Sequence, residues 1–305
     1  MSILVLGTVA LDTVKTPCGL RKDILGGSAV HFSMSARLFS GVSLVAVVGE
    51  DFPKQHLGFL RRKGLDISAI TQSAGKTFKW SGEYQGDLNS AITHHTELGV
   101  LLNFQPAISN AHKKSKYLFL ANIDPVIQRQ VIRSMQSPRL IALDSMNFWI
   151  NNKRQELVKT LKLTNIYVAN DQEARQLSQE NNLFKAAKAL TRLGPKMILI
   201  KKGEHGVLFY SDKYIFVLPA YPVERVVDPT GAGDTFAGGF MGYLAKAKKT
   251  DSQTIKKALA YGTICASINV EDFGTGCTDG LKSVDLDKRM RRFSKIAGLN
   301  LDIRK

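Results

Sequence analysis

The sequence has few cysteines and no long hydrophobic run. Its 305 residues include 3 Cys, at Cys18, Cys265 and Cys277, and no two of them form a CxxC pair. Neither a disulfide framework nor a zinc site is therefore indicated, and we expect a reducing, cytoplasmic environment. No apolar stretch reaches the roughly 18 residues that a membrane span needs, so we expect no membrane partner.

Acidic residues are too few to balance the basic ones. There are 42 Lys and Arg against 26 Asp and Glu, which gives a formal net charge of +16. A charge of this size makes nucleic acid or anionic lipid a partner to consider. The basic clusters at 61–63, 113–114, 246–249 and 288–292 lie far apart in the sequence, however. A solvated basic surface is the favoured interpretation, and a patch that binds a polyanion is the alternative.

Two common nucleotide-binding motifs are missing. The sequence contains no GxxxxGK[ST] stretch, which excludes a P-loop enzyme. It also lacks GxGxxG after the first apolar run, which argues against an oxidoreductase that uses a dinucleotide. The first residues, MSILVLGTVALDTVKTP, have no basic segment before the apolar run and are interrupted by Asp12. They predict a first β-strand better than a signal peptide.

Short apolar runs alternate with helical patterns along the chain, which is typical of an α/β fold with a largely parallel sheet. We predict strands at residues 3–11, 42–49, 117–123, 140–144, 166–170 and 197–203, and helices at 26–39, 53–64 and 186–194. Four of the strands end near a polar residue or a glycine, namely Asn122, Asp144, Asn170 and Gly203. Ligands bind beyond the carboxyl ends of such strands, so we expect these residues along one functional edge.

Residues 76–104 break this alternation. They contain consecutive β-like segments with glycine-containing turns, and no helix is expected between them. An antiparallel flap would explain the pattern, and such flaps often close over active sites as lids. An ordinary surface hairpin is the alternative.

The stretch GAGD places Gly231, Ala232 and Gly233 directly before Asp234 and an apolar helical pattern. The first N–H groups of a helix have no partner within the helix and point toward any anion placed there. Small residues let a phosphate approach that backbone closely. The stretch therefore predicts an anion hole made of main chain.

Asp234 allows two interpretations. A carboxylate in the first turn can cap the helix. It can also accept the proton of a substrate hydroxyl while that oxygen attacks a phosphate held by the anion hole. Phosphoryl transfer depends mainly on such positioning and on neutralisation of charge.

The stretch DPTGAGDTFAGGF, which begins at Asp228, closely resembles the C-terminal signature of the ribokinase-like sugar and nucleoside kinases of the phosphofructokinase-B type. Three further stretches resemble motifs of that family in the family's order: GGSAVHFSMSARL with the following VVGEDFPKQHLGFLRRKGLD, NDQEA at 170–174, and KKGEHG at 201–206. The resemblance covers nearly the whole chain. It implies one ribokinase-like catalytic domain over residues 1–305. The implied fold is a three-layer α/β sandwich whose mostly parallel central sheet is flanked by helices, with a small β lid formed by residues 12–25 and 76–104.

The resemblance also implies roles for the residues that match the motifs. On the nucleotide side, Asp234 is the implied catalytic base, and the anion hole is formed by Gly231, Ala232 and Gly233. Asn170 and Glu173 are implied to organise Mg²⁺ around the phosphates of ATP, with Glu173 acting mainly through water. Without the motif, Glu173 could be a solvated helix residue. Gly203 and Gly206 are implied to lie against the nucleotide or could form a simple β-turn, and Lys201 could reach a phosphate or be exposed.

Other matching positions concern the acceptor and a second cation. Asp12, Gly26 and Gly27 match the residues that hold the hydroxyl groups of the acceptor, although Asp12 could also be a turn residue at the end of a strand. Many family members carry asparagine four residues after the second glycine, where this chain has His31. Asp228 and Thr230 match part of a K⁺ site that several members have, although Asp228 could be an ordinary turn residue.

We therefore predict a kinase that transfers the γ-phosphate of ATP, with Mg²⁺ and with K⁺ as an option, to a hydroxyl group of a sugar or related small molecule. A nucleoside kinase of the same fold is the alternative within the class. A basic nucleic-acid-binding or regulatory protein on a degenerate kinase fold is the alternative from another class. Its only support is the charge, and the intact motifs argue against it. The exposed edges of the lid predict a possible homodimer.

Overall fold

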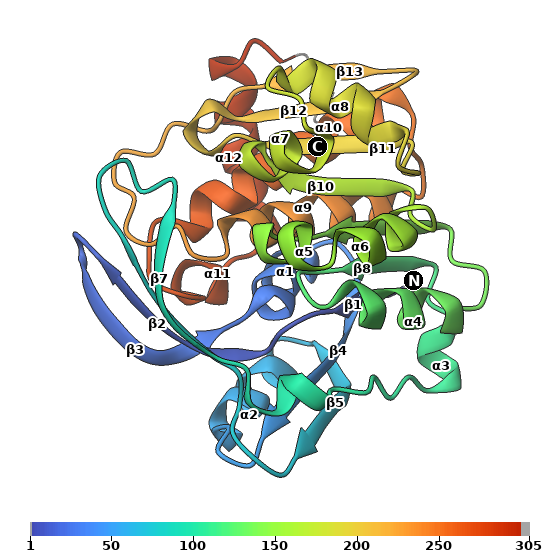
Figure 1. Ribbon diagram of the computed structural model, residues 1–305. Coiled ribbons are helices and arrows are strands. Elements are labelled where there is room, and N and C mark those ends of the chain that lie inside the picture. The colour runs from blue at the N-terminus through green and yellow to red at the C-terminus, as the bar shows by residue number, and fades with distance from the viewer. Residues whose placement is uncertain (1, 300–305) are drawn as a thin grey trace.

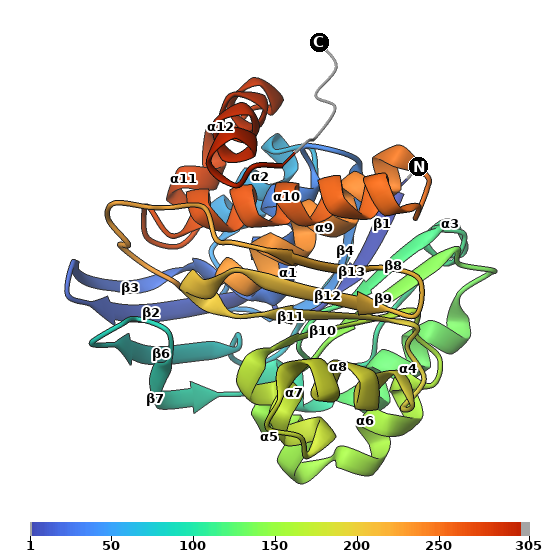
Figure 2. The same ribbon diagram turned by 90° about the horizontal axis from the view of Figure 1, so that it is seen from above.

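The central feature of the fold is a nine-stranded sheet with the strand order β13-β12-β11-β10-β9-β8-β1-β4-β5 (Figures 1 and 2). It belongs to a computed structural model that describes residues 2–299. The parallel strands are β1 (Ser2–Leu6), β4 (Gly41–Gly49), β5 (Asp66–Ser73), β8 (Tyr117–Leu120), β9 (Leu140–Asp144), β10 (Ile166–Asn170) and β11 (Met197–Lys201). Two antiparallel strands, β12 (Val207–Ser211) and β13 (Ile215–Leu218), complete one edge. Parallel strands that are buried on both faces require nearly uninterrupted apolar runs, and the sequence supplies them.

Helices cover both faces of this sheet and produce three layers, which Figure 2 shows from above. One face carries α1 (Ser28–Ala36), α9 (Ala232–Ala247), α10 (Ser252–Asn269) and α12 (Ser283–Ile296), and the other carries α4 (Pro125–Ser134), α6 (Arg154–Leu161), α7 (Asp171–Ser178) and α8 (Leu183–Thr191). The remaining helices are α2 (Lys54–Arg62), α3 (Asn110–Lys113), α5 (Asn147–Asn152), α11 (Gly276–Asp279) and the 3₁₀ helices η1 (Gly99–Asn103) and η2 (Gly203–His205). A separate hydrophobic core fills each side of the sheet. The predicted fold class is confirmed.

A second, four-stranded sheet lies to one side of the main sheet (Figures 1 and 2). Its strand order is β3-β2-β6-β7, from β2 (Ala10–Thr16), β3 (Gly19–Gly26), β6 (Lys79–Tyr84) and β7 (Ala91–Glu97). We call it the lid sheet. It combines the two segments in which the sequence analysis expects a lid, and its action as a lid stays a prediction.

The predicted first strand, residues 3–11, is wrong as a single element. The chain leaves the main sheet after β1 and enters the lid sheet at β2. Between them, the Thr8 N–H group donates to Oγ of Ser28 over 3.1 Å, and the Thr8 carbonyl accepts from the N–H group of Ala29 over 3.0 Å. These bonds tie the chain to the start of α1, so tertiary contacts override a locally continuous β pattern.

No helix lies between β6 and β7, as predicted for residues 76–104, but a short 3₁₀ helix follows β7 at the end of this range. Residues Gly99–Asn103 form η1, and Gly99 has a φ of 49° in the left-handed region. The N–H group of Val100 donates to the carbonyl of Lys76 over 2.9 Å, which closes the segment on its own beginning. In the part of the chain that the structure describes, no helix is long and apolar enough to cross a membrane.

Candidate active site

The predicted anion hole lies at the start of α9. Its N-cap residue, Gly231, has φ 71° and ψ 3°, a left-handed conformation that favours glycine. No side chain caps this helix. The N–H group of Ala232 donates to the carbonyl of Pro229 over 3.1 Å, while those of Gly233 and Asp234 have no partner among the described residues and are left for another acceptor. A Cβ atom at Gly231 would lie 2.2 Å from Cγ of His31, and one at Gly233 would lie 2.8 Å from Nζ of Lys201. The small residues therefore allow two candidate site residues to lie directly against this backbone.

Asp234 lies in the first turn of α9 without capping it. The structure thus gives no hydrogen bond in support of the helix-cap interpretation among residues 2–299. The pKa of Asp234 is raised to about 8, mainly by burial and in addition by the negative charge of Asp144, while Lys201 opposes both effects. A carboxyl group with this pKa can exchange a proton near neutral pH.

A buried ion pair lies beside Asp234. Nζ of Lys201, at the end of β11, is 2.8 Å from Oδ2 of Asp144, at the end of β9. Burial alone would lower the pKa of Lys201, but the carboxylates of Asp144, Glu173 and Asp234 raise it above its usual value. The alternative that Lys201 is an exposed side chain is wrong, because only 18% of it is exposed. Lys201 thus pairs with Asp144 and also feels the negative charges of Glu173 and Asp234.

Asn170 and Glu173 form a reciprocal cap at the start of α7. Oδ1 of Asn170 accepts from the N–H group of Glu173 over 2.7 Å, and Oε2 of Glu173 accepts from the N–H group of Asn170 over 2.8 Å. Glu173 is only 7% exposed, so the alternative of a solvated helix residue is wrong. Burial raises the pKa of Glu173 to about 8, and the neighbouring Asp144 adds to the shift.

The predicted nucleotide-side glycines lie in the tight turn between β11 and β12. Gly203 and Gly206 have φ angles of 54° and 82°. The N–H group of Gly206 donates to the carbonyl of Gly203 over 3.1 Å, so the β-turn interpretation describes the local structure. A role toward a nucleotide stays a prediction.

The predicted acceptor side lies where the lid sheet meets α1. Asp12 of β2 is 5% exposed, and its Oδ2 atom accepts from the N–H group of Gly27 over 3.3 Å. A Cβ atom at Gly26 would lie 1.9 Å from the same oxygen, so only glycine leaves room for the carboxylate. The pKa of Asp12 is raised to about 7, mainly by burial and in addition by the charge of Asp228, while the hydrogen bond from the Gly27 N–H group opposes the shift. His31 is 2% exposed and lies on the first turn of α1.

Tyr84 links the lid sheet to this site. Burial raises the pKa of its hydroxyl to about 12, and the carboxylates of Asp228, Asp12 and Asp234 contribute to that shift. The end of β6 therefore faces the candidate site. Trp80, in contrast, donates from Nε1 to Oγ1 of Thr93 within the lid sheet.

Asp228 is fully buried beside the anion hole. Its Oδ1 atom accepts from the N–H group of Thr230 over 2.8 Å, and its Oδ2 atom accepts from the N–H group of Gly274 over 3.0 Å. The carboxylate therefore fixes the loop before α9, as a turn residue does. A K⁺ ion beside it stays a prediction.

Sequence reasoning overlooked two residues of this region. The sequence analysis placed Asp144 at the functional edge but did not predict its ion pair with Lys201, because the two residues are 57 positions apart. Asn269, at the end of α10, contacts both His31 and Thr235. No local pattern distinguishes Asn269 from a surface asparagine near a helix end, so the sequence carried no signal for it.

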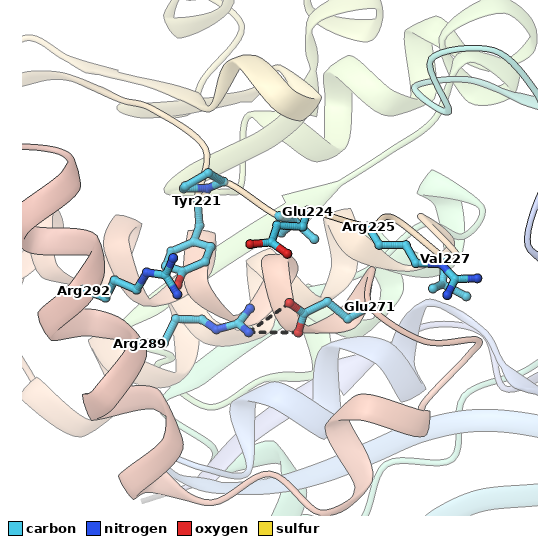
Figure 3. Close-up of a pocket in the computed structure, with 9 residues that line it drawn as sticks. Tyr221, Glu224, Arg225, Val227, Glu271, Arg289 and Arg292 are labelled. Carbon is cyan, nitrogen blue, oxygen red and sulfur yellow. Dashed lines mark hydrogen bonds and ion pairs between the residues drawn. The ribbon is translucent and has the colours of Figure 1, made fainter.

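A separate open pocket of about 460 Å³ lies between the loop after β13 and α12 (Figure 3). Arg289 crosses it, donating to both carboxylate oxygens of Glu271 over 3.0 and 2.9 Å and lying over the ring of Tyr221. None of the residues predicted for the active site lines this pocket. Arg289 is paired with Glu271, and Arg225 and Arg292 also line the pocket, which lies apart from the residues of the candidate chemistry.

Comparison with known proteins gives one consistent family. Residues 20–279 match the pfkB family of carbohydrate kinases. The chain is 32% identical over 248 residues to a cytidine kinase from Thermococcus kodakarensis, which covers 79% of this chain and 87% of the relative.

Solved structures agree at the level of the fold. The nucleoside kinase of Methanocaldococcus jannaschii superimposes with a TM-score of 0.74 at 21% identity, covering 95% of this chain and 98% of that one. A fructokinase double mutant from Vibrio cholerae, solved with fructose, ADP and potassium, gives a TM-score of 0.79 at 16% identity, covering 95% and 98%.

Proposed function

The chain belongs to the pfkB family of carbohydrate kinases, and from this premise we propose that the acceptor of its phosphoryl group is a nucleoside. It is an ATP-dependent phosphotransferase that acts on a hydroxyl group of a sugar or nucleoside. Kinases of this family use ATP together with Mg²⁺. The observation that carries the nucleoside proposal is the 32% identity to a cytidine kinase over 79% of the chain.

We assign the chemistry to Asp234. Its carboxylate accepts the proton of the acceptor hydroxyl while that oxygen attacks the γ-phosphorus, and the bond from phosphorus to the bridging oxygen of ADP breaks. The N–H groups of Gly231 and Gly233 stabilise the charge on the transferring group. Lys201, oriented by Asp144 over 2.8 Å, adds a positive charge beside Gly233.

The residues around this pair fit a divalent cation. Lys201 lies near the carboxylates of Asp144, Glu173 and Asp234. Burial raises the pKa values of Glu173 and Asp234 most, and the negative charge of Asp144 adds to both shifts. Within residues 2–299, no three His, Cys, Asp or Glu side chains gather closely enough to hold a metal ion directly. We infer that Glu173 and Asn170 hold Mg²⁺ mainly through water, as suits a strongly hydrated ion. Bound there, Mg²⁺ neutralises the phosphate charge.

On the remaining sides, Gly203 and Gly206 would support the nucleotide, and Asp12, Gly26, Gly27 and His31 would hold the acceptor. A carboxylate such as Asp12 suits this role because it can accept from two hydroxyl groups. We further propose that K⁺ binds at Asp228 and Thr230. Replacing K⁺ in the assay with tetramethylammonium tests this site. A loss of turnover would support the cation.

The deciding experiment is an ATP-consumption screen over nucleosides, free sugars and polyols. We expect the best nucleoside to exceed every sugar in kcat/KM by at least about 100-fold, since buried polar groups left unpaired by the wrong substrate cost that much or more. A free sugar as the best acceptor would contradict the nucleoside proposal and leave the kinase assignment intact. Fructose is the sugar to include, because of the fructokinase likeness.

Two finer proposals concern assembly and location. β7 is exposed over nearly its whole length and forms one edge of the lid sheet, so a second copy could pair with it. Sedimentation at several concentrations tests this homodimer. A cytoplasmic location rests on the three free cysteines, Cys18, Cys265 and Cys277.

A further inference from the structure

Asn269 connects three parts of the candidate site from behind. It is the last residue of α10 and only 1% exposed. Its Nδ2 atom donates to the carbonyl of Thr230 over 2.8 Å, and its Oδ1 atom accepts from Oγ1 of Thr235 over 3.0 Å. The same oxygen lies 3.3 Å from Nδ1 of His31. One amide thus contacts the residue before Gly231, the residue after Asp234, and α1.

These contacts fix the orientation of the amide. The carbonyl of Thr230 can only accept a hydrogen bond, so the side facing it must be the NH₂ group of Asn269. The opposite side is therefore the oxygen, and it faces the ring of His31. Because that oxygen can only accept, Nδ1 of His31 carries the proton.

The tautomer of His31 follows from the same argument. Burial lowers the pKa of His31 against the opposing influence of Asp228 and Asn269, so the ring is neutral at pH 7. With the proton on Nδ1, the Nε2 atom carries a lone pair and can only accept a hydrogen bond. This atom is buried and has no hydrogen-bond partner among the described residues. A buried acceptor without a partner is costly, which points to a donor supplied by a ligand.

We propose that Asn269 is a positioning residue for the phosphoryl transfer. It holds the backbone before the anion hole. It also fixes the tautomer of His31 in which Nε2 accepts a hydrogen bond from a hydroxyl group of the acceptor. The site beside His31 suits such a donor. His31 lies one turn after Gly27, whose N–H group binds Asp12. An acceptor with neighbouring hydroxyl groups can donate to both Asp12 and His31. The inference rests on the proposed kinase function and deepens it.

The first test is the tautomer itself, which requires no variant. The ¹⁵N chemical shifts of His31 in the labelled wild-type protein distinguish a protonated ring nitrogen from a bare one. We expect Nδ1 to be protonated and Nε2 to be bare at pH 7, and we expect the Nε2 signal to move when the acceptor binds. A proton on Nε2 in the free enzyme would overturn the proposal, even if the variants below do not fold.

The second test is Asn269→Leu, which has a similar size but cannot make the three bonds. We expect the acceptor KM to rise about tenfold and kcat to fall about tenfold, in line with the loss of single hydrogen bonds. In a His31→Leu background, the effect of Asn269→Leu on the acceptor KM should shrink below about twofold, because it acts through His31. The effect on kcat, which acts through Thr230, should persist.

Asn165→Leu is the matched control. Oδ1 of Asn165 accepts from the N–H group of Ile141 over 2.7 Å, before the start of β10 and remote from the site. A merely structural role of Asn269 predicts that both variants lose stability and that neither changes the acceptor KM, which would overturn the proposal. If the wild type phosphorylates no acceptor in the screen, the proposed function fails instead, and the tautomer result still stands.

Discussion

At the scale of single residues, Asp234 differs from an ordinary helix-start carboxylate, because it makes no cap and its pKa is raised to about 8. We predict that Asp234→Asn lowers turnover on the order of 10²–10⁴-fold, since it removes the proton acceptor and keeps the shape. The ATP KM should change little.

The chain supplies the control for that experiment. Asp251 caps α10 by accepting from the N–H group of Thr254 over 2.9 Å. Because Asn caps about as well as Asp, Asp251→Asn should be nearly silent. If Asp234→Asn is equally silent, Asp234 is not the base. Turnover and melting temperature measured for both variants decide this.

Substitutions of Lys201 and Asp144 distinguish a contribution of this ion pair to stability from a contribution to catalysis. Lys201→Met leaves three carboxylates without their ammonium group, and breaking a buried pair in this way costs about 3–5 kcal/mol of stability. We predict that the double variant Asp144→Asn/Lys201→Met regains much of the melting temperature but keeps kcat/KM for ATP reduced about 100-fold. Recovery of activity together with stability would show that Lys201 has only a structural role.

At the scale of elements, the lid sheet is placed to control access to the acceptor. Tyr84 ends β6, and besides burial the carboxylates of Asp12, on the adjacent strand β2, and of Asp234, on α9, raise the pKa of its hydroxyl. We predict that Tyr84→Ala raises the acceptor KM and the fraction of ATP lost to water, because water is a competing phosphoryl acceptor. His95→Ala, an exposed change on β7, should alter neither quantity. An unchanged ratio of hydrolysis to transfer in Tyr84→Ala would contradict the lid.

The elements also show how far the sequence predicts this molecule. Apolar runs and glycine-rich starts located most of the predicted strands and helices, and the family motifs located Asp234, Glu173 and Lys201. The break at Thr8 was missed because its hydrogen bonds run to Ser28 and Ala29, 20 or more positions away. Asn269 was missed for the same reason, since its partners lie on three other segments.

At the scale of the whole molecule, the net charge of +16 remains outside the assigned chemistry. Several basic groups are engaged locally, such as Lys201 with Asp144 and Arg289 with Glu271. We predict only weak, non-specific DNA binding, with a Kd no tighter than about 10⁻⁶ M at physiological salt. A salt titration that reveals tight, steeply salt-dependent binding would favour the nucleic-acid-binding alternative.

The carboxylates of the site connect its chemistry to global stability. Asp12, Glu173 and Asp234 have folded-state pKa values raised to about 7, 8 and 8. A group whose pKa is raised on folding contributes stability that is complete below its unfolded pKa, near 4, and that is lost as the pH rises through the folded value. The metal-free enzyme should therefore lose stability from these groups between about pH 4 and pH 8.

The charge of the whole molecule acts in the opposite direction, because raising the pH reduces a net positive charge and its self-repulsion. Comparison with a variant removes this common effect. Asp234→Asn deletes one of the three groups, so its melting temperature should rise relative to that of the wild type as the pH increases from 5 to 8.5. A relative gain of about 1.5 °C corresponds to about 1 kcal/mol for a domain of this size. Mg²⁺ with ATP should reduce this gain, since a bound cation stabilises the ionised carboxylates of the wild type. A melting-temperature difference that does not change with pH would contradict the raised pKa of Asp234 and the proton transfer that depends on it.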